Sequence, residues 1–498
     1  MAAANLEPAQ ADVAELRTAF DRAGWTVDRI AEILGDVAAA ALARNETVPA
    51  RRACLADGST AATLTRLFVL QDTIPISEAA RALPLEAAGR LSLIIDERNV
   101  VRALLAVRPH EEGLYVVSDL ACGLDARIRP VAGDHVLGIG GASMSLADLT
   151  VRQQIGSALD LGTGCGVQAF HLTRHANRVV ATDVLPRALR FAALGAALSG
   201  VLVDLREGSL FEPVAGERFD LVVSNPPFAI GAVADGARTY RDSGLAGDEV
   251  CRRLVAAVPE HLNPGGWCQL LANWVHRRGE DWRDRVGGWL PDGVDAWALQ
   301  REVLDPAAYV SLWLHDSGEV AGLDYPQRYD RWLDGLERAG VEAIGFGWLT
   351  LRRTEAAPVV RIEKWPHPVE HPLGPTVADT FERMDWLRAH EDPRALLAAQ
   401  LQLVGDVVQE QRGLPGAEDP TELTLRQNYG MRRVRRVDTA TAALVGACDG
   451  ELPVGVLVDA VAEVLEEPVG QVREQVLPLL RELVAEGFLS PQPSGQDN

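Results

Sequence analysis

The sequence Asn-Pro-Pro-Phe at residues 225–228 carries the most specific chemistry in the chain. It follows the apolar run Phe219–Ser224, which predicts a buried strand ending where ligands bind in open α/β sheets. Pro226 and Pro227 fix the backbone and hold nearby carbonyl groups in place. The Asn225 amide offers an acceptor and donors, and the Phe228 ring can stack on a flat group. Together they could hold a planar amino or amide nitrogen. The alternative is a proline-terminated edge strand with a chance aromatic.

A glycine-rich turn precedes this tetrad in the chain. In Asp-Leu-Gly-Thr-Gly-Cys-Gly, Gly162, Gly164 and Gly166 alternate, whereas a dinucleotide fingerprint places its third glycine three residues after the second. Glycines are needed where the chain turns sharply or a ligand approaches the backbone. Asp160 would repel a pyrophosphate and suits a cationic or amino-acid-bearing ligand. The pattern, including Thr163, favours a cofactor loop over a plain structural turn.

Asp183 is a second acidic residue at a strand end. It closes the predicted strand Arg178–Thr182, one strand–helix–strand step after Asp160. A carboxylate at the end of the neighbouring strand can accept both hydroxyl hydrogens of a ribose. The alternative role is an N-cap for a helix over Pro186–Leu198. Beside the glycine loop, the ribose role is favoured.

The elements that must position these residues alternate between short apolar runs and helical stretches, from about Asp134 to Trp365. This alternation predicts a parallel sheet with crossover helices. The predicted strands are Ala158–Leu161, Arg178–Thr182, Asp220–Ser224 and Trp267–Ala272, with an antiparallel pair near Ala296–Val303 and Ile344–Arg352. The insertion within that pair carries four aromatic residues that could line a substrate: Trp313, Tyr325, Tyr329 and Trp332.

Mainly helical segments flank the sheet, and a length of 498 residues predicts about two to four domains. Residues 1–133 are predicted to be helical with a small hairpin near Val100–Val107 and Gly113–Ser118. Residues 421–498 are predicted to contain three helices: Thr439–Ala447, Val454–Leu465 and Val469–Ala485. Both segments look winged-helix-like. The Gly/Pro-containing stretch Arg412–Pro420 predicts a joint, so the sheet domain is assigned to residues 134–411.

In order and spacing, residues 160–166, Asp183 and residues 225–228 resemble the motifs of class I S-adenosylmethionine-dependent methyltransferases that modify exocyclic or amide nitrogens. Residues 207–213, Glu-Gly-Ser-Leu-Phe-Glu-Pro, look particularly like release-factor glutamine methyltransferases. The tetrad is also similar to that of ribosomal-RNA guanine-N2 and adenine-N6 methyltransferases. The resemblance covers roughly Leu159–Trp274. It implies an α/β, Rossmann-like class I methyltransferase sheet, flanked by N-terminal and C-terminal mainly helical, winged-helix-like modules.

The resemblance also implies roles for individual residues. The loop with Asp160, Gly162, Thr163, Gly164 and Gly166 would pass along the methionine and ribose of S-adenosylmethionine. Asp183 would hold the ribose hydroxyls, and Ser209 and Leu210 would border the adenine. Many relatives carry an acid at the position of Ser209, so we expect a weaker or rearranged adenine contact. Asn225 and the Pro226 carbonyl would hold the target nitrogen, with Phe228 stacked against it. This chemistry requires no metal.

Further residues are candidates for substrate contact. Arg238, Tyr240 and Arg241 follow the tetrad in a segment that predicts a loop over the substrate, with the arginines facing an anionic group; a solvated loop is equally consistent. Trp274 ends the predicted strand Trp267–Ala272 and is expected to face the substrate pocket.

A basic cluster lies near the C-terminus of an otherwise acidic chain. It comprises Arg426, Arg432, Arg433, Arg435 and Arg436, with Tyr429 among them. Arginine beside an aromatic residue is typical of nucleic-acid contact. The alternative is a solvated face paired with acids. The net charge of −22 gives no general help in approaching RNA.

Composition sets the remaining expectations. No apolar run approaches the ~18 residues needed to cross a bilayer, and the first ten residues lack the features of a signal peptide. The six cysteines have no paired spacing, which predicts reduced thiols and no zinc site. We therefore expect a cytoplasmic enzyme without membrane or metal. The leading hypothesis is N-methylation of an RNA base in ribosomal or transfer RNA. The alternatives are N-methylation of a glutamine in a translation factor, or of a small molecule.

Overall fold

The computed structural model describes residues 8–111, 113–126, 132–227, 229–230, 247–316, 324–415 and 420–491. The chain divides into two compact units. The first comprises Met1–Ala147 and Gln153–Pro366, and the second comprises Asp148–Arg152 and His367–Asn498. The second unit thus begins earlier than the predicted joint at 412–420.

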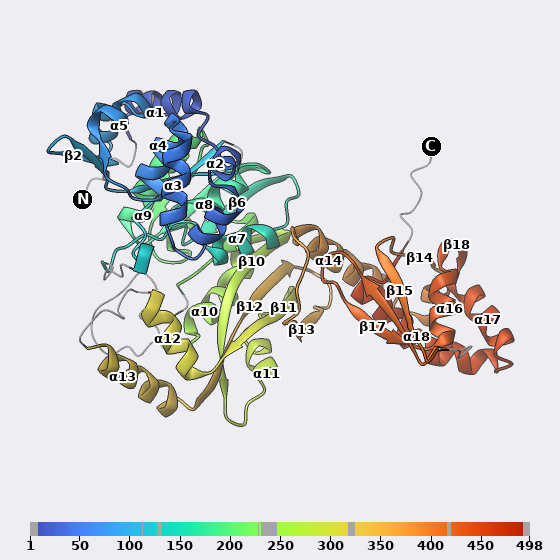
Figure 1. Ribbon diagram of the computed structural model, residues 1–498. Helices are drawn as coiled ribbons and strands as arrows, with labels where there is room; N and C mark the ends of the chain where they lie inside the picture. The colour runs from blue at the N-terminus through green and yellow to red at the C-terminus, as the bar shows by residue number, and fades with distance from the viewer. Residues whose placement is uncertain are drawn as a thin grey trace. The chain divides into compact units, whose positions relative to one another are not determined.

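The N-terminal part of the first unit is mainly helical (Figure 1). Its helices are α1 (Gln10–Ala23), α2 (Val27–Leu42), α3 (Val48–Asp57), α4 (Thr60–Leu64), the π-helical turn η1 (Thr65–Val69), α5 (Ile76–Ala82) and α6 (Leu85–Arg90). Thr26 caps α2 by accepting from Arg29 N, and Ser59 caps α4 by accepting from Ala62 N.

Short strands complete this N-terminal part: β1 (Ile74–Pro75), β2 (Ile94–Glu97), β3 (Val100–Ala103), β4 (Ala106–His110) and β5 (Leu114–Ser118), followed by the turn η2 (Leu124–Ala126). The first three form an antiparallel sheet in the order β1-β3-β2, with α5 and α6 between β1 and β2 in the chain. Helices followed by this short sheet are compatible with the winged-helix-like module, which stays a prediction. The pair β4–β5 forms a separate hairpin that packs on the helix α9 (Pro186–Ser199).

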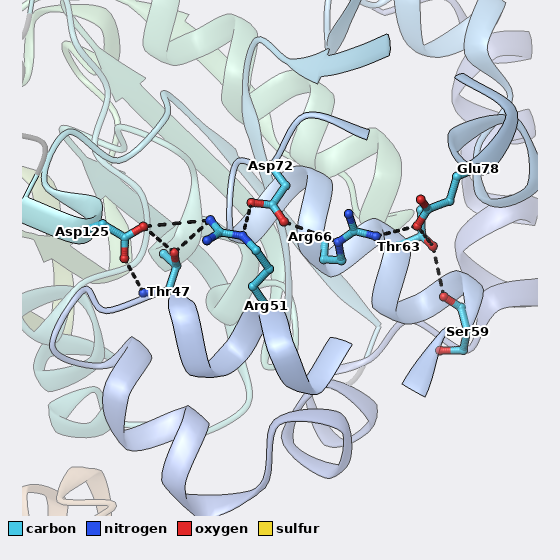
Figure 2. Close-up of polar contacts among 8 residues, drawn as sticks. All are labelled: Thr47, Arg51, Ser59, Thr63, Arg66, Asp72, Glu78 and Asp125. Carbon is cyan, nitrogen blue, oxygen red and sulfur yellow. Dashed lines mark hydrogen bonds and ion pairs between the residues drawn. The ribbon is translucent and has the colours of Figure 1, made fainter. Parts of the chain in front are cut away.

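A polar network ties the N-terminal helices together (Figure 2). Arg66 on η1 lies between Asp72 and Glu78, at 3.4 Å and 2.6 Å, and only 11% of its side chain is exposed. Asp72 also accepts from Arg51 of α3 at 2.7 Å. Asp125 of η2 accepts from the backbone N–H of Thr47 at 2.7 Å. Segments far apart in sequence are therefore joined by largely buried charges, each of which has an opposite partner.

The central sheet contains eight strands among the described residues, in the order β13-β11-β12-β10-β9-β6-β7-β8. Their bounds are β6 (Ile155–Leu161), β7 (Ala176–Asp183), β8 (Asp204–Glu207), β9 (Phe219–Ser224), β10 (Leu262–Arg277), β11 (Val294–Leu304), β12 (Val341–Arg353) and β13 (Val360–Lys364). The strands β8, β7, β6, β9 and β10 are parallel, whereas β12 is antiparallel to both β10 and β11. The predicted antiparallel pair is confirmed; β8 and β13 were not predicted.

Helices cover the sheet because its strands are apolar on both faces. They are α8 (Val167–Leu172), α9, α10 (Glu249–Ala257), α11 (Trp282–Gly287), α12 (Pro306–Asp316) and α13 (Tyr325–Arg338). The helix α7 (Gly141–Leu149) precedes β6 in the chain, and two short turns are η3 (Glu212–Val214) and η4 (Val258–His261). The helices α12 and α13 form the predicted insertion between β11 and β12 and lie against each other (Figure 1).

The second unit combines helices with short antiparallel strands. It contains α14 (Gly374–Ala389), α15 (Pro393–Ala398), β14 (Gln400–Leu403), β15 (Val407–Arg412), β16 (Glu422–Gln427), β17 (Val434–Val437), α16 (Thr439–Ala447), β18 (Asp449–Pro453), α17 (Val454–Val464), α18 (Val469–Glu486) and β19 (Leu489–Pro491). The predicted helices of this region correspond to α16, α17 and α18. The sheet order β18-β14-β19 is winged-helix-like, with β14 supplied from before α16.

The predicted joint at residues 412–420 connects two strands of this same unit. Strands β15 and β16 are antiparallel and pair from Val407 with Gln427 to Arg412 with Glu422. The helix α14 packs on α18 and contributes Trp386 and Leu387 to its core. Residues 367–411 therefore belong with the C-terminal elements, because their apolar side chains are buried there. Among the described residues, no helix is both long and apolar enough to span a membrane.

Candidate active site

The glycine loop links β6 to α8 at the carboxyl edge of the sheet. Leu161 pairs with Thr182 of β7 and with Ser224 of β9. Gly162, Asp183 and Asn225 directly follow these three residues, so they lie at the same level of three adjacent strands. Ser224 Oγ donates to the Leu161 carbonyl at 2.8 Å. The parallel strands thereby bring together the glycine loop, the acidic strand end and the tetrad, as the sequence predicts.

The loop glycines have different surroundings. Gly164 and Gly166 have φ values of +55° and +87°, a region that favours glycine. A Cβ at Gly164 would meet nothing within 4 Å, whereas one at Gly166 would lie 2.6 Å from Phe170 Cζ. Gly166 therefore permits helix packing, and Gly164 borders open space where a ligand can approach the backbone. This open space fits the predicted cofactor.

Asp160 is buried beneath the loop. Its Oδ2 accepts from Thr163 Oγ1 at 2.6 Å and from Ala169 N at 3.0 Å. Burial raises the pKa of Asp160 to about 7, although these two donors oppose the rise. The carboxyl group thus fixes the start of α8 and the position of Thr163. Its role toward a cofactor stays a prediction.

Asp183 ends β7 and is half-buried. Its Oδ2 accepts from Gly164 N at 2.8 Å and its Oδ1 accepts from Leu185 N at 2.9 Å. Burial raises the pKa of Asp183, while the backbone donors oppose the rise. The N-cap position of α9 is Leu185, and Asp183 does not accept from the first turn of that helix. The carboxylate therefore shapes the glycine loop, and each oxygen retains a further lone pair for a ribose hydroxyl.

The residues predicted to border adenine follow β8. Ser209 is exposed and Leu210 is half-buried with a positive φ of +46°, unusual for a non-glycine residue. Gly208 N donates to the Asp183 carbonyl at 3.0 Å. The backbone bond fixes this turn next to Asp183, which suits the predicted roles of Ser209 and Leu210.

The tetrad leaves β9 beside the loop. Asn225 is half-buried, Pro226 is buried and Pro227 is exposed. Within the described part of the chain, the Asn225 side chain makes no hydrogen bond, so its amide is available to a ligand. Phe228 lies outside the described residues, as do Arg238, Tyr240 and Arg241.

Trp274 does not face a substrate pocket, contrary to the prediction. It is fully buried, its ring stacks on Trp282 with centroids 5.6 Å apart, and its Nε1 donates to Gln300 at 2.8 Å. The strand β10 continues to Arg277, well past the predicted end at Ala272, so Trp274 lies in the sheet interior. It belongs to the core packed beneath α11.

Sequence reasoning missed Tyr309 on α12. This fully buried residue accepts from the backbone N–H of Ile230, just past the tetrad, at 2.6 Å. Trp332 Nε1 donates to the Ile230 carbonyl at 2.9 Å. A signal was present, since Tyr309 precedes Trp313 by one helical turn in an insertion already noted for its aromatic residues.

A second polar cluster joins the β4–β5 hairpin to α8. His110 Nε2 and His171 Nε2 are 2.8 Å apart, a hydrogen bond in one tautomer. Arg174 pairs with Glu111 at 2.9 Å, and Glu111 lies 3.5 Å from His171 Nδ1. Imidazole nitrogens lie ~2.0–2.1 Å from zinc, so two ligands of one tetrahedral ion would be more than ~3 Å apart. The distance favours direct contact, and the expectation of no metal stays a prediction.

Five of the six cysteines are buried, and Cys122 is partly exposed. All lie within the described residues and none forms a disulfide. Burial raises the pKa of Cys54, Cys165 and Cys448 to about 11, so these thiols stay protonated at neutral pH.

The arginine cluster of the second unit is largely paired with acids. Arg426 pairs with Glu410 at 2.7 Å, Arg432 pairs with Glu370 at 3.1 Å, and Arg435 pairs with Glu482 and Glu486. Arg433 is buried. Arg436 is 71% exposed and lies 3.9 Å from Glu422. This favours the alternative of a paired surface for most of the cluster.

Comparison with known families agrees with the geometry. Residues 139–280 match the family model described as the methyltransferase small domain. Residues 139–280 are therefore a methyltransferase domain. The predicted class I, Rossmann-like methyltransferase fold is confirmed by this match and by the sheet order. Residues 22–104 and 378–491 match two further models, each described as a domain of unknown function (DUF7059 and DUF7782).

Curated relatives of two kinds match the chain. The release factor glutamine methyltransferase of Geobacter sulfurreducens is 35% identical over 188 residues, which cover 34% of this chain and 64% of that protein. That of Deinococcus radiodurans is 43% identical over 119 residues, covering 22% and 42%.

The ribosomal RNA small subunit methyltransferase C of Alcanivorax borkumensis is 35% identical over 118 residues, covering 24% of this chain and 32% of that protein. The chain spans about half the length of the curated relatives it matches. Both kinds of relative were named in the sequence-based resemblance, which is confirmed.

Proposed function

We propose that this protein is an S-adenosylmethionine-dependent N-methyltransferase acting on a planar nitrogen, an exocyclic amino or an amide group. The observation that carries the proposal is the half-buried Asn225 amide, which is free of hydrogen bonds to described residues and starts from the strand next to the glycine loop. An amide in this position can bind the N–H groups of a planar nitrogen and orient its lone pair.

The residues around Asn225 have separate roles in this proposal. Gly164 leaves room for the cofactor against the backbone, and Asp183 holds that loop and offers lone pairs to a ribose. Ser209 and Leu210 border the adenine. S-adenosylmethionine, when bound, supplies an activated methyl group. Since the electrophile is already activated, the chain mainly aligns the nucleophile, and Asn225 carries most of that task.

Transfer of a labelled methyl group tests the proposal. Extract from cells lacking the enzyme is incubated with the protein and labelled S-adenosylmethionine, then separated into RNA, protein and small molecules. Label in any fraction is expected, and Asn225→Ala should reduce it at least ~10²-fold, a typical cost of lost orientation. The matched control is Asn263→Ala, which removes a bond to Asp220 at 2.7 Å near the start of β10. Absence of label in all fractions refutes the activity.

Within this class, an RNA base is the substrate we propose first. Two winged-helix-like modules support it, because helix-turn-helix variants commonly dock on nucleic acid. The likeness to ribosomal RNA methyltransferase C also supports it. A cytoplasmic location remains part of this proposal.

A glutamine side chain of a translation factor is the second candidate. The ion pairing of Arg426, Arg432 and Arg435 favours it, because paired arginines are less available to phosphates. The likeness to release factor glutamine methyltransferases covers the larger share of the chain.

The two most exposed members of the cluster distinguish these substrates. Reversing the charge of Arg432 or Arg435 would place like charges next to Glu370 or Glu482, so folding and recognition would change together. Arg436→Gln and Tyr429→Ala avoid this, since both side chains are exposed. With RNA as substrate, labelling of the RNA fraction should fall several-fold and more steeply at high salt. Unchanged RNA labelling removes the cluster from recognition, and label confined to protein replaces the first candidate by the second.

A further inference from the structure

Ile230 is held by side chains on both of its backbone groups. Its N–H donates to Tyr309 Oη at 2.6 Å, and its carbonyl accepts from Trp332 Nε1 at 2.9 Å. Tyr309 lies on α12 and Trp332 on α13, so both donor and acceptor come from the insertion between β11 and β12. We call this pair the Ile230 anchor.

The anchor is set in a packed apolar environment. Tyr309 is fully buried and Ile230 is 3% exposed. They share a core with Val310, Leu314 and Ile344, against which Trp313 and Trp332 pack. The Tyr309 hydroxyl also accepts from Asn273 Nδ2 at 3.4 Å, which links it to β10. Burial raises the pKa of Tyr309, so the hydroxyl stays neutral and serves as a fixed acceptor.

The position of the anchor connects it to the tetrad. On one side of Asn225, Ser224 is fixed in β9 and bonded to the Leu161 carbonyl at 2.8 Å. On the other side, the backbone of Ile230 is the next among the described residues to be bonded by side chains of another segment. Pro226 and Pro227 lie between them, and their fixed φ limits how far a shift can be absorbed.

We infer that the α12–α13 insertion is the positioning element of the active site, with Tyr309 and Trp332 acting through the backbone of Ile230 to orient Asn225 toward the target nitrogen. This inference rests on the proposed function. Neither residue needs to touch the substrate: both hold the backbone of Ile230, which follows the tetrad, while β9 ends at Ser224 directly before Asn225. Catalytic groups held on both sides keep their alignment without reorganisation.

Conservative substitutions test the inference. Tyr309→Phe removes only the hydroxyl that accepts from Ile230, and Trp332→Phe removes only the indole donor and part of the ring. The matched control is Tyr115→Phe on β5, a buried tyrosine outside the insertion whose hydroxyl donates to the Trp25 carbonyl at 3.3 Å. Methyl transfer is measured per cofactor-binding site, with sites counted by calorimetric titration with S-adenosylmethionine. A loss of folded protein lowers the number of sites and leaves the rate per site unchanged.

The expected result is a rate per site about 10- to 100-fold lower in Tyr309→Phe, the size of effect that follows an ångström-scale misplacement. Affinity for S-adenosylmethionine should stay within about twofold, and Tyr115→Phe should match the wild type. If Tyr309→Phe folds poorly, Trp332→Phe provides the test, because it removes the donor to the Ile230 carbonyl and keeps the bond from the Ile230 N–H to Tyr309. An unchanged rate per site in both variants overturns the inference.

Hydrogen exchange gives a readout that needs no substrate. The Ile230 amide should exchange faster in Tyr309→Phe than in the wild type or Tyr115→Phe, because its buried acceptor is gone. If the wild type labels no fraction of the extract, the proposed function fails. The exchange comparison then decides whether the anchor holds this segment, and equal exchange in all three proteins refutes it.

Discussion

Substituting alanine for Gly164 or for Gly166 adds one methyl group, which should weaken cofactor binding at the first position and lower stability at the second. Both residues lie in the loop after β6 with positive φ, +55° and +87°. At Gly164 the added Cβ would enter space that is open within 4 Å. At Gly166 it would lie 2.6 Å from Phe170 Cζ and 3.2 Å from Ala192 Cβ. The same substitution therefore meets a ligand site in one case and the core in the other.

The magnitudes follow from these surroundings. An alanine in the left-handed region costs about 1–2 kcal/mol, and this is the whole expected loss of stability for Gly164→Ala. Gly166→Ala adds overpacking against Phe170 of about 1–3 kcal/mol. Gly216→Ala is the matched control, with φ of +79° and nothing within 4 Å of its Cβ. At about 2–4 °C per kcal/mol, the difference between Gly166→Ala and the control is measurable by thermal unfolding.

Calorimetric titration with S-adenosylmethionine gives the second measurement. Gly164→Ala should unfold at the same temperature as Gly216→Ala but bind the cofactor at least about tenfold more weakly, a loss of about 1.4 kcal/mol. Gly216→Ala should bind it as the wild type does. Wild-type affinity in Gly164→Ala would show that the open space is not part of the cofactor site. Equal stability of Gly166→Ala and Gly216→Ala would refute the steric argument.

Three further substitutions test individual contacts. Burial raises the pKa of Asp160 from 3.8 to about 7, so the folded chain retains a proton that the unfolded chain releases. Wild-type stability should therefore fall as the pH rises from about 4 to about 7. Asp160→Asn should remove this pH dependence. Unfolding temperatures at pH 5 and pH 8 check this, and parallel shifts in both proteins would contradict it. Trp274→Phe should lower stability by about 1–3 kcal/mol, because Gln300 Oε1 loses the indole donor and keeps only its contact with His276. The KM for the methyl acceptor should not change; a changed KM would restore a substrate role. Arg66→Met should lower the free energy of unfolding, measured with a chemical denaturant, by about 1–3 kcal/mol, because Asp72 and Glu78 lose a partner that is only 11% exposed. This loss lies between those typical of breaking exposed and buried ion pairs. Arg29→Met, which breaks the pair between Asp57 and an Arg29 side chain that is 36% exposed, should cost clearly less than Arg66→Met; an equal cost would remove burial as the cause.

Local chemistry explains which features could be predicted from the sequence. Apolar runs identified β6, β7, β9 and β10, because strands buried on both faces need uninterrupted apolar residues. Alternating glycines marked the loop after β6, because glycine adopts a positive φ at a lower cost than other residues do. In a parallel sheet, adjacent strand ends meet at one edge, so the convergence of Gly162, Asp183 and Asn225 also followed from the chain. The short strand β8, Asp-Leu-Arg-Glu, had no apolar run to reveal it.

The roles of Trp274 and the arginines depended on partners distant in sequence. Trp274 is buried because Trp282 and Gln300 surround it, and nothing in its own strand predicts them. Arg432 and Arg435 are paired because folding brings Glu370, Glu482 and Glu486 next to them. Charge patterns in a sequence give the composition of a surface, whereas ion pairing depends on distances of a few ångströms that only the fold sets.

The sequence by itself determined the methyltransferase sheet, the glycine loop and the tetrad, because each depends on backbone preferences and apolar patterns within a short segment. Only the tertiary structure decided which side chains hold that segment in place. Tyr309 and Trp332 reach Ile230 from an insertion far along the chain, and each oxygen of Asp183 accepts from one backbone N–H group. Such contacts arise from packing, where residues become neighbours through the topology of the sheet and not through their order in the chain.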